Sequence, residues 1–235
     1  MLITFEDRPS DSPLIERVWR SHSEGAGTFL SMAACNWVMV VTRVAGQTTL
    51  TVRGPETRAT PADCPADGEW IGVHFRLGTF MPLLPPGMLR DRNDVTLPAA
   101  SRRAFWLNGS AWEYPGFDNA ETFVRRLVKH GLVAGDPYVA DVLRGEAGRL
   151  SQRTDQRRVL RATGMTAATI HQIERARRAV ARLRGGASIA DVAQDAGYFD
   201  QAHLTRSLKR FIGQTPMQIV RSQEQLSLLY NTDQA

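Results

Sequence analysis

The sequence has very few cysteines and almost no lysine. Only Cys35 and Cys64 occur in 235 residues, so we expect no disulfide framework and a reducing, cytoplasmic location. Lys129 and Lys209 are the only lysines among 29 basic residues, and all the others are arginines. Arginine suits bidentate contacts with guanine and phosphate, but a codon bias toward arginine would explain the same composition.

Long hydrophobic runs and targeting patterns are also missing. No segment approaches the roughly 18 apolar residues of a membrane span. The first residues, MLITFEDRPSDSP, are acidic and polar, unlike a signal peptide. The hydrophobic fraction of 43% and the charged fraction of 23% are ordinary for a globular protein. We therefore expect no membrane partner.

Motifs for catalysis and metal binding are not found. The sequence contains no glycine-rich phosphate loop, no GxSxG elbow and no HExxH. His22, His74, Cys35 and Cys64 lack the spacing of metal ligands. We therefore expect no catalytic residue, no metal, no cofactor and no enzymatic activity.

The aromatic residues leave two interpretations open. They could line a pocket for a small-molecule effector, whose binding residues the sequence does not identify, or they could simply pack in a core. The residues concerned are Trp19, Trp37, Trp70, Trp106, Trp112 and Tyr114.

The positive charge is concentrated toward the C-terminus. Residues 1–136 hold 14 Lys/Arg and 15 Asp/Glu, whereas residues 137–235 hold 15 Lys/Arg and 9 Asp/Glu. The net charge of +5 therefore comes from the second part. Such an asymmetry is expected if only that part meets phosphate groups.

The pattern of residues 28–76 predicts β-strands. Two β-rich runs flank Ala45-Gly46-Gln47, which predicts a hairpin, and TTLTV alternates polar and apolar side chains. A loop rich in Pro, Asp and Gly is predicted over 60–68, and EWIGVHFRLG predicts another strand.

Beyond these strands the sequence predicts proline-rich loops and short helices, in residues 78–92 and 101–115. Together the two regions predict a β-rich domain with some helix over residues 1–117.

The remainder, residues 118–235, is predicted to be helical. Asp118 or Asn119 can cap a helix that runs to His130, and Pro137 fits the first turn of a helix that ends at Arg144.

Two further helices follow. Ser151 begins one that Gly164 ends, and residues 166–184 predict the longest helix, which Gly185-Gly186 closes. Its roughly 19 residues would span about 28 Å.

The segment 188–216 predicts two short helices joined by a tight turn. Ser188 is a good N-cap, and Gly197 lies where the first helix must end, in a left-handed conformation that glycine tolerates. Asp200 caps the second helix. Its inward face carries Leu204, Leu208, Phe211 and Ile212, and its outer face carries Gln201, Thr205, Arg206, Lys209 and Arg210. Such a helix suits a DNA major groove, although a helical hairpin with a solvated basic face is the alternative.

The stretch AGYFDQAHLTRSLKRFIGQTP resembles the signature of the AraC/XylS family of bacterial transcription regulators. The matching positions are Gly197, Tyr198, Leu204, Thr205, Arg206, Leu208, Lys209, Ile212, Gly213, Thr215 and Pro216. The resemblance extends over roughly residues 119–222. It implies two helix-turn-helix units, at about 137–164 and 188–216, joined by the helix 166–184.

The fold expected from the resemblance is α+β. A β-rich, sensor-like N-terminal domain (1–117) would precede an all-α double helix-turn-helix DNA-binding domain (118–235) with a long connecting helix. The front half is faintly similar to the sensor or dimerisation domains of such regulators.

The first unit departs from the family pattern. Asp155 stands where the family normally has a buried apolar residue, Val159 replaces a usual Phe, and the loop EAGRL (146–150) looks long. We therefore expect the second unit to carry more of the recognition.

The resemblance and the helix faces together suggest the residues that contact DNA. Arg157 and Arg206 could read guanine, Gln156 and Gln201 could read adenine, and Ala202 or the Thr205 methyl group could touch thymine. The full set of expected base contacts is Arg153, Gln156, Arg157, Gln201, Ala202, Thr205 and Arg206. Arg161, Lys209 and Arg210 are expected to contact phosphates.

The function expected is a sequence-specific, DNA-binding transcription factor whose activity responds to an effector. We expect an activator, although the sequence leaves activator and repressor open. Its partners would be double-stranded promoter DNA, a small-molecule effector, RNA polymerase and a second copy of the chain. It would reside in a bacterial cytoplasm, at the nucleoid when bound to DNA. The alternatives are a DNA-binding enzyme and a non-specific architectural protein.

Overall fold

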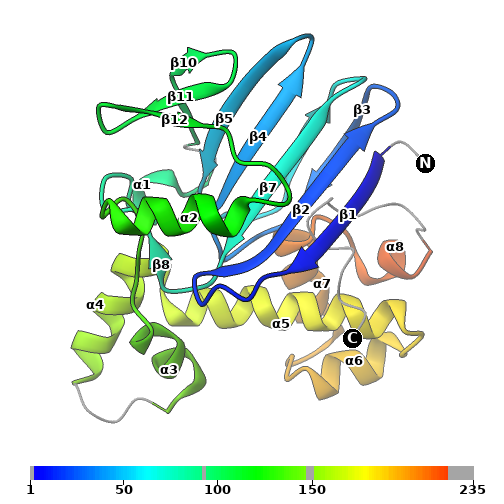
Figure 1. The fold of residues 1–235 in the computed structure, drawn as a ribbon. Helices are drawn as coiled ribbons and strands as arrows, with labels where there is room; N and C mark the ends of the chain where they lie inside the picture. Colours follow the sequence, from blue (N-terminus) through cyan, green and yellow to red (C-terminus); the bar gives the residue numbers. More distant parts are fainter. Residues whose placement is uncertain (1–2, 92–93, 147–150, 222–235) are drawn as a thin grey trace. The chain divides into compact units, whose positions relative to one another are not determined.

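The computed structural model describes residues 3–91, 94–146 and 151–221 (Figure 1). The chain divides into two compact units. Unit 1 comprises Met1–Gly27, Asn36–Pro55 and Cys64–Ala167, and unit 2 comprises Thr28–Cys35, Glu56–Asp63 and Ala168–Ala235. The β-rich N-terminal region and the helical C-terminal region confirm the α+β class. The packing nevertheless groups the chain differently from a linear division after residue 117.

Unit 1 contains a six-stranded sheet in the order β1-β2-β7-β4-β5-β9. All its neighbouring strands pair antiparallel. The strands are β1 (Ile3–Pro9), β2 (Ile15–Ser23), β4 (Val38–Val44), β5 (Gln47–Arg53), β7 (Glu69–Phe75) and β9 (Val95–Leu97). The predicted hairpin is confirmed between β4 and β5, where Ala45 and Gly46 both have positive φ.

Helix α2 (Ala120–Lys129) packs on this sheet (Figure 1). Its Phe123, Val124 and Leu127 are buried in the same core cluster as Val18 of β2 and Val73 of β7. Residues that the sequence assigned to the helical domain therefore complete the core of the sheet.

Part of the sequence-based prediction for the N-terminal region is wrong. Residues 101–115 were expected to form loops and short helices, but β10 (Ala99–Ser101), β11 (Ala104–Leu107) and β12 (Ser110–Glu113) form a small antiparallel sheet. The missed signal is Asn108-Gly109, whose φ angles of 49° and 73° suit a tight hairpin.

Other predictions for this region are partly confirmed. The predicted loop 60–68 contains a strand, β6 (Thr60–Cys64), and the prediction missed β1 and β2. Residues 78–92 contain the short helix α1 (Pro86–Leu89), as expected, and the two-residue strand β8 (Thr79–Phe80), which pairs with β13 (Ala134–Gly135). The last elements of unit 1 are α3 (Tyr138–Arg144) and α4 (Gln152–Thr163).

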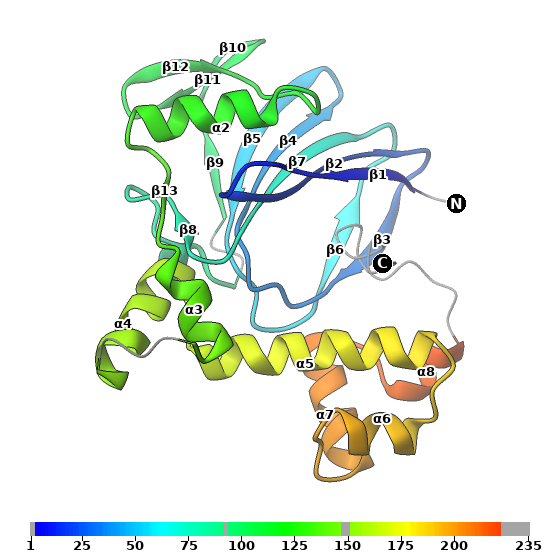
Figure 2. The ribbon, with the colours of Figure 1, turned by 60° about the horizontal axis from the view of Figure 1, so that its bottom comes forward.

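Unit 2 combines helices with a two-stranded ribbon. The ribbon pairs β3 (Gly27–Ser31) with β6, and the helices are α5 (Ala167–Arg184), α6 (Ile189–Asp195), α7 (Gln201–Phe211) and α8 (Pro216–Arg221). Figure 2 shows α6 and α7 beside α5. The predicted helix 166–184 and both helices of the second helix-turn-helix are therefore confirmed.

Within the described residues, no helix is long and apolar enough to cross a membrane. Cys35 and Cys64 are both buried.

Candidate nucleic-acid interface

The turn between α6 and α7 is built as the sequence predicted. The Ser188 side chain caps α6 by accepting a hydrogen bond from the Asp191 amide. Gly197 has a φ of +70°, which a side chain would disfavour. The Asp200 carboxylate then caps α7 by accepting a hydrogen bond of 2.6 Å from the His203 amide. The entry into α7 is therefore fixed by local chemistry.

Buried side chains hold α7 in place. Leu204, Leu208 and Ile212 are each 0% exposed, as the inward stripe predicted. Tyr198 is also buried, and its hydroxyl lies 3.2 Å from the Ser207 hydroxyl.

Helix α5 supports the same turn. The Arg175 guanidinium donates to the Gly197 carbonyl at 3.3 Å and lies 4.4 Å from the centre of the Tyr198 ring. Arg182 pairs with Asp195 of α6 at 2.6 Å. Contacts from α5 therefore help to hold α6 and the turn before α7 in position.

The outer face of α7 is free to meet a partner. Gln201, Ala202 and Arg206 are exposed, as are Lys209 and Arg210. The five side chains offer an amide, a methyl group and three cations, which are the groups that bind base edges and phosphates.

Thr205 differs from its neighbours on this face. It is half-buried, and its hydroxyl donates to the Gln201 carbonyl at 2.8 Å. This bond occupies the hydroxyl hydrogen inside the helix, so the methyl group is the better candidate for a contact with thymine.

The first unit presents its predicted residues on α4. Ser151 caps the helix by accepting from the Thr154 amide. The exposed side chains include Arg153, Gln156, Arg157 and Arg161. Sequence reasoning therefore placed all four on a solvent-accessible surface.

Helix α4 is anchored by polar contacts to residues at the start of α3. The Arg158 guanidinium donates to both carboxylate oxygens of Asp136, at 2.9 and 2.7 Å, and lies 4.6 Å from the centre of the Tyr138 ring. Sequence reasoning did not single out Arg158, which follows Arg157 directly.

The predicted irregularities of the first unit are partly visible. Asp155 is half-buried, and its buried Oδ1 has no hydrogen-bond partner among the residues that the structure describes. Val159 is 0% exposed, as expected for the position of a usual Phe. The loop predicted to be long falls largely on residues 147–150, which lie outside the described ranges.

Sequence reasoning missed one exposed residue of the second unit. Phe199 is 93% exposed and directly precedes the N-cap Asp200. The available signal was the aromatic pair Tyr198-Phe199, of which the signature requires only the first. A phenyl ring this exposed, next to the N-cap of α7, marks a candidate contact surface.

Unit 1 contains an open pocket of about 600 Å³ at one end of its sheet. Two pairs of residues from the β1–β2 register line this pocket: Thr4 with His22, and Glu6 with Arg20. Its lining carries charges of both signs, including Arg20, which donates to Glu6 at 2.7 Å. Gly116–Asp118 also lines the pocket. Such a mixed lining suits a small polar molecule.

The aromatic residues mostly belong to the core rather than to this pocket. Trp37 and Trp112 are in the core cluster, and Tyr114 packs against it. Trp70 is the one member of the proposed aromatic set that lines the pocket. Among the described residues, no group of three or more His, Cys, Asp or Glu side chains is arranged to hold a metal ion.

An ion pair joins β1 to α2. The Arg8 guanidinium donates to the Glu121 carboxylate at 2.6 and 2.9 Å, and Ser10 donates at 2.9 Å. The Arg8 hydrogen bonds are the main cause that lowers the pKa of Glu121 from 4.5 to about 2, against the opposing effect of burial.

Residues 146–222 match a family model described as a helix-turn-helix domain, of the AraC type. This match supports a DNA-binding transcription regulator with an AraC-like helix-turn-helix. No curated protein and no solved structure matches the chain.

Proposed function

We propose that the protein regulates transcription by binding double-stranded DNA in a sequence-specific manner through α4 and α7. The observation that carries the proposal is α7, which is capped by Asp200, buried along its inner stripe and exposed along a face of polar and basic side chains. The α6–α7 pair lies inside the helix-turn-helix match. The protein would act by binding DNA rather than by catalysing a reaction.

We assign roles to the exposed residues of α7 by their chemistry. Arg206 and Gln201 are assigned to guanine and adenine, and Ala202 and the Thr205 methyl group are assigned to thymine. Lys209 and Arg210 lie in the last turn of the helix and are assigned to phosphates, which fix register without reading sequence.

Helix α4 receives the corresponding roles. Arg153, Gln156 and Arg157 would contact bases, and Arg161 a phosphate. Phe199 adds an apolar contact to the DNA sugars or a thymine methyl group beside α7. The pocket of unit 1 would bind a small polar effector, and RNA polymerase and a second copy of the chain are further proposed partners.

The test is a comparison of two substitutions on one helix face. A duplex is first selected from a random-sequence pool by the wild-type protein. We expect Arg206→Ala to lose about 1–3 kcal/mol of discrimination at one base position. Lys209→Ala should weaken binding to all duplexes alike and should reduce the salt dependence of the affinity. Phe199→Ser should lower the affinity without lowering the melting temperature.

Three results would argue against these assignments. Identical specificity in the Arg206 and Lys209 variants would overturn their roles. Equal wild-type affinity for random and selected duplexes would favour a non-specific architectural protein. Unchanged DNA affinity of Phe199→Ser would point to a protein partner for that ring.

A further inference from the structure

The C-terminal end of α7 is held by two segments that lie far away in the sequence. The Ala33 amide donates to the Phe211 carbonyl at 2.8 Å, and the Ala59 amide donates to the Arg210 carbonyl at 2.9 Å. The last four carbonyls of a helix have no partner within it. Residues 28–35 and 56–63, which we call the clamp, supply partners for two of them.

Steric contact reinforces these hydrogen bonds. Gly213 has a φ of +82°, and a Cβ atom there would lie 2.4 Å from Leu30 Cδ2 and 3.1 Å from Ala59 Cβ. Both neighbours belong to the clamp. The absence of a side chain at Gly213 therefore permits the clamp to approach the end of α7 closely.

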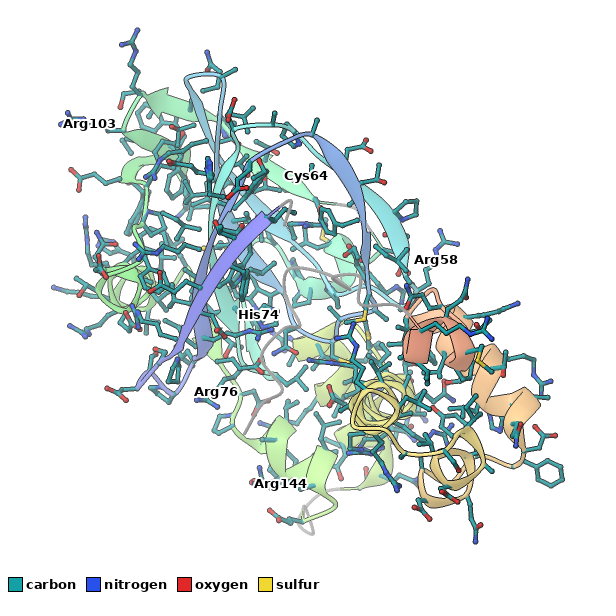
Figure 3. All side chains as sticks on the ribbon, turned by 90° about the vertical axis from the view of Figure 1, so that its right-hand side faces the viewer. Arg58, Cys64, His74, Arg76, Arg103 and Arg144 are labelled. Atoms are coloured by element: carbon teal, nitrogen blue, oxygen red, sulfur yellow. The ribbon has the colours of Figure 1, made fainter. Side chains whose placement is uncertain are left out.

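The two segments of the clamp are fastened to each other. Ala34 and Glu56 exchange backbone hydrogen bonds of 2.9 and 2.8 Å. The Ser31 hydroxyl donates to the Glu56 carboxylate at 3.1 Å, and Glu56 is only 6% exposed. Arg58, which Figure 3 labels, is an exposed residue of the clamp. The hydrogen bonds that Glu56 makes with Ala34 and Ser31 therefore join the two segments.

The clamp also contacts the connecting helix. Cys35 Sγ lies 4.0 Å from the Ile170 carbonyl oxygen, and Cys35 is 2% exposed. The same short segment therefore touches α5 through Cys35 and the end of α7 through Ala33.

The clamp continues the strands that form the pocket. β3 begins four residues after β2 ends, and β6 ends five residues before β7 begins. Buried Ser23, the last residue of β2, ties the end of that strand to the β6–β7 connection: its hydroxyl donates to the Pro65 carbonyl at 2.6 Å and accepts from the Gly68 amide at 2.9 Å. β2 and β7 also supply His22 and Glu69 to the pocket.

We propose that the clamp is a regulatory link that positions α7 for DNA binding and that β2 and β7 control it. This inference rests on the proposed DNA-binding function and extends it to regulation of the same helix. When the clamp is docked, α7 keeps the orientation in which its outer face binds DNA. When the clamp loosens, the affinity for DNA falls. Because coupling between two equilibria is reciprocal, bound DNA must in turn stabilise the docked clamp.

The experiment compares two substitutions on β3 in the full chain. Leu30→Ala removes the side chain that meets Gly213, and Thr28→Ala is the control, since Thr28 is exposed on the same strand. The probe is the duplex that the wild-type protein selects from a random pool. We expect Leu30→Ala to bind it on the order of tenfold more weakly, and Thr28→Ala to bind it as the wild type does.

Hydrogen exchange of the wild-type protein gives an independent measurement. It tests the proposed role of the clamp even if Leu30→Ala fails to fold. The amides of Ala33 and Ala59 should exchange more slowly when the duplex is bound. Unchanged exchange at both amides, or equal affinity of the two variants, would overturn the clamp while leaving the DNA-binding function intact. A wild-type protein that selects no duplex would overturn the proposed function first, and the clamp's role with it.

Discussion

Helices α4 and α7, to which we assign similar roles, are held in place by different forces. Helix α7 buries Leu204, Leu208 and Phe211, whereas the buried residues of α4 are Val159, Ala162 and Thr163. Helix α4 relies more on Arg158, which forms an ion pair and a ring contact. Apolar burial scales with the area removed from water, while a partly exposed ion pair contributes little and is weakened by salt.

The C-terminal ends of the two helices also have different surroundings. Gly164, after α4, approaches α1 so closely that a Cβ atom would lie 2.7 Å from the Gly87 nitrogen. Gly213, after α7, approaches the clamp. The C-terminal end of α4 therefore packs against α1 in unit 1, whereas that of α7 packs against the clamp in unit 2. A change in α1 or in the clamp should therefore affect α4 and α7 differently.

The largest expected effect comes from the core of the second unit. Leu208 is 0% exposed, so Leu208→Ala should cost about 2–5 kcal/mol of local stability. Arg158→Ala should cost the first unit less, about 1 kcal/mol, because its ion pair is partly exposed. Hydrogen exchange of α7 and α4 in the two variants measures both losses. An equal loss of protection in the two helices would remove the distinction between them.

A smaller effect is expected at the irregular residue of the first unit. Asp155→Leu should stabilise α4 by about 1 kcal/mol, because it removes a buried carboxylate oxygen that has no partner among the described residues. Asp191→Leu is the matched control. Asp191 is exposed and, like Asp155, lies in the first turn of its helix, so both variants lose the same favourable interaction with the helix dipole.

Thermal melting of the two variants measures this difference. A higher melting temperature for Asp155→Leu but not for Asp191→Leu would confirm that burial is the cause. A lower melting temperature for Asp155→Leu would show that the carboxylate supports α4.

The last effect is of similar size at neutral pH but is lost in acid, and it concerns only unit 1, which contains Glu121. The pKa of Glu121 is lowered to about 2 in the folded protein, so its stabilisation is complete above pH 4.5 and is lost as the pH falls toward 2. Glu121→Gln should therefore lower the stability of unit 1 by about 1 kcal/mol at neutral pH. The difference from wild type should shrink in that acid range.

Melting curves between pH 2 and pH 7 test this, with Glu113→Gln as a control at an exposed position. If the loss of stability in Glu121→Gln did not change with pH, packing rather than charge would explain the effect of the substitution.

The local features of the second unit could be predicted because they depend on neighbouring residues. The caps at Ser188 and Asp200, the left-handed Gly197 and the inward stripe of α7 all follow from residues within one or two helical turns. The same reasoning placed the candidate DNA contacts of both units on exposed faces, except for half-buried Thr205. It failed at Asn108-Gly109, where a readable hairpin signal was overlooked, and at β1 and β2.

The sequence by itself determined where the second helix-turn-helix begins, how its helices are capped and which side chains it exposes. Only the tertiary structure decided that Ala33 and Ala59 satisfy the end of α7, that α2 completes the core of the sheet and that Phe199 stays exposed. The physical reason is the separation in sequence between the groups that interact. A cap joins residues three positions apart, whereas the Ala59 and Ala33 amides meet carbonyls more than 150 positions later in the sequence. Such backbone bonds use groups that every residue carries and therefore leave no pattern in the side chains.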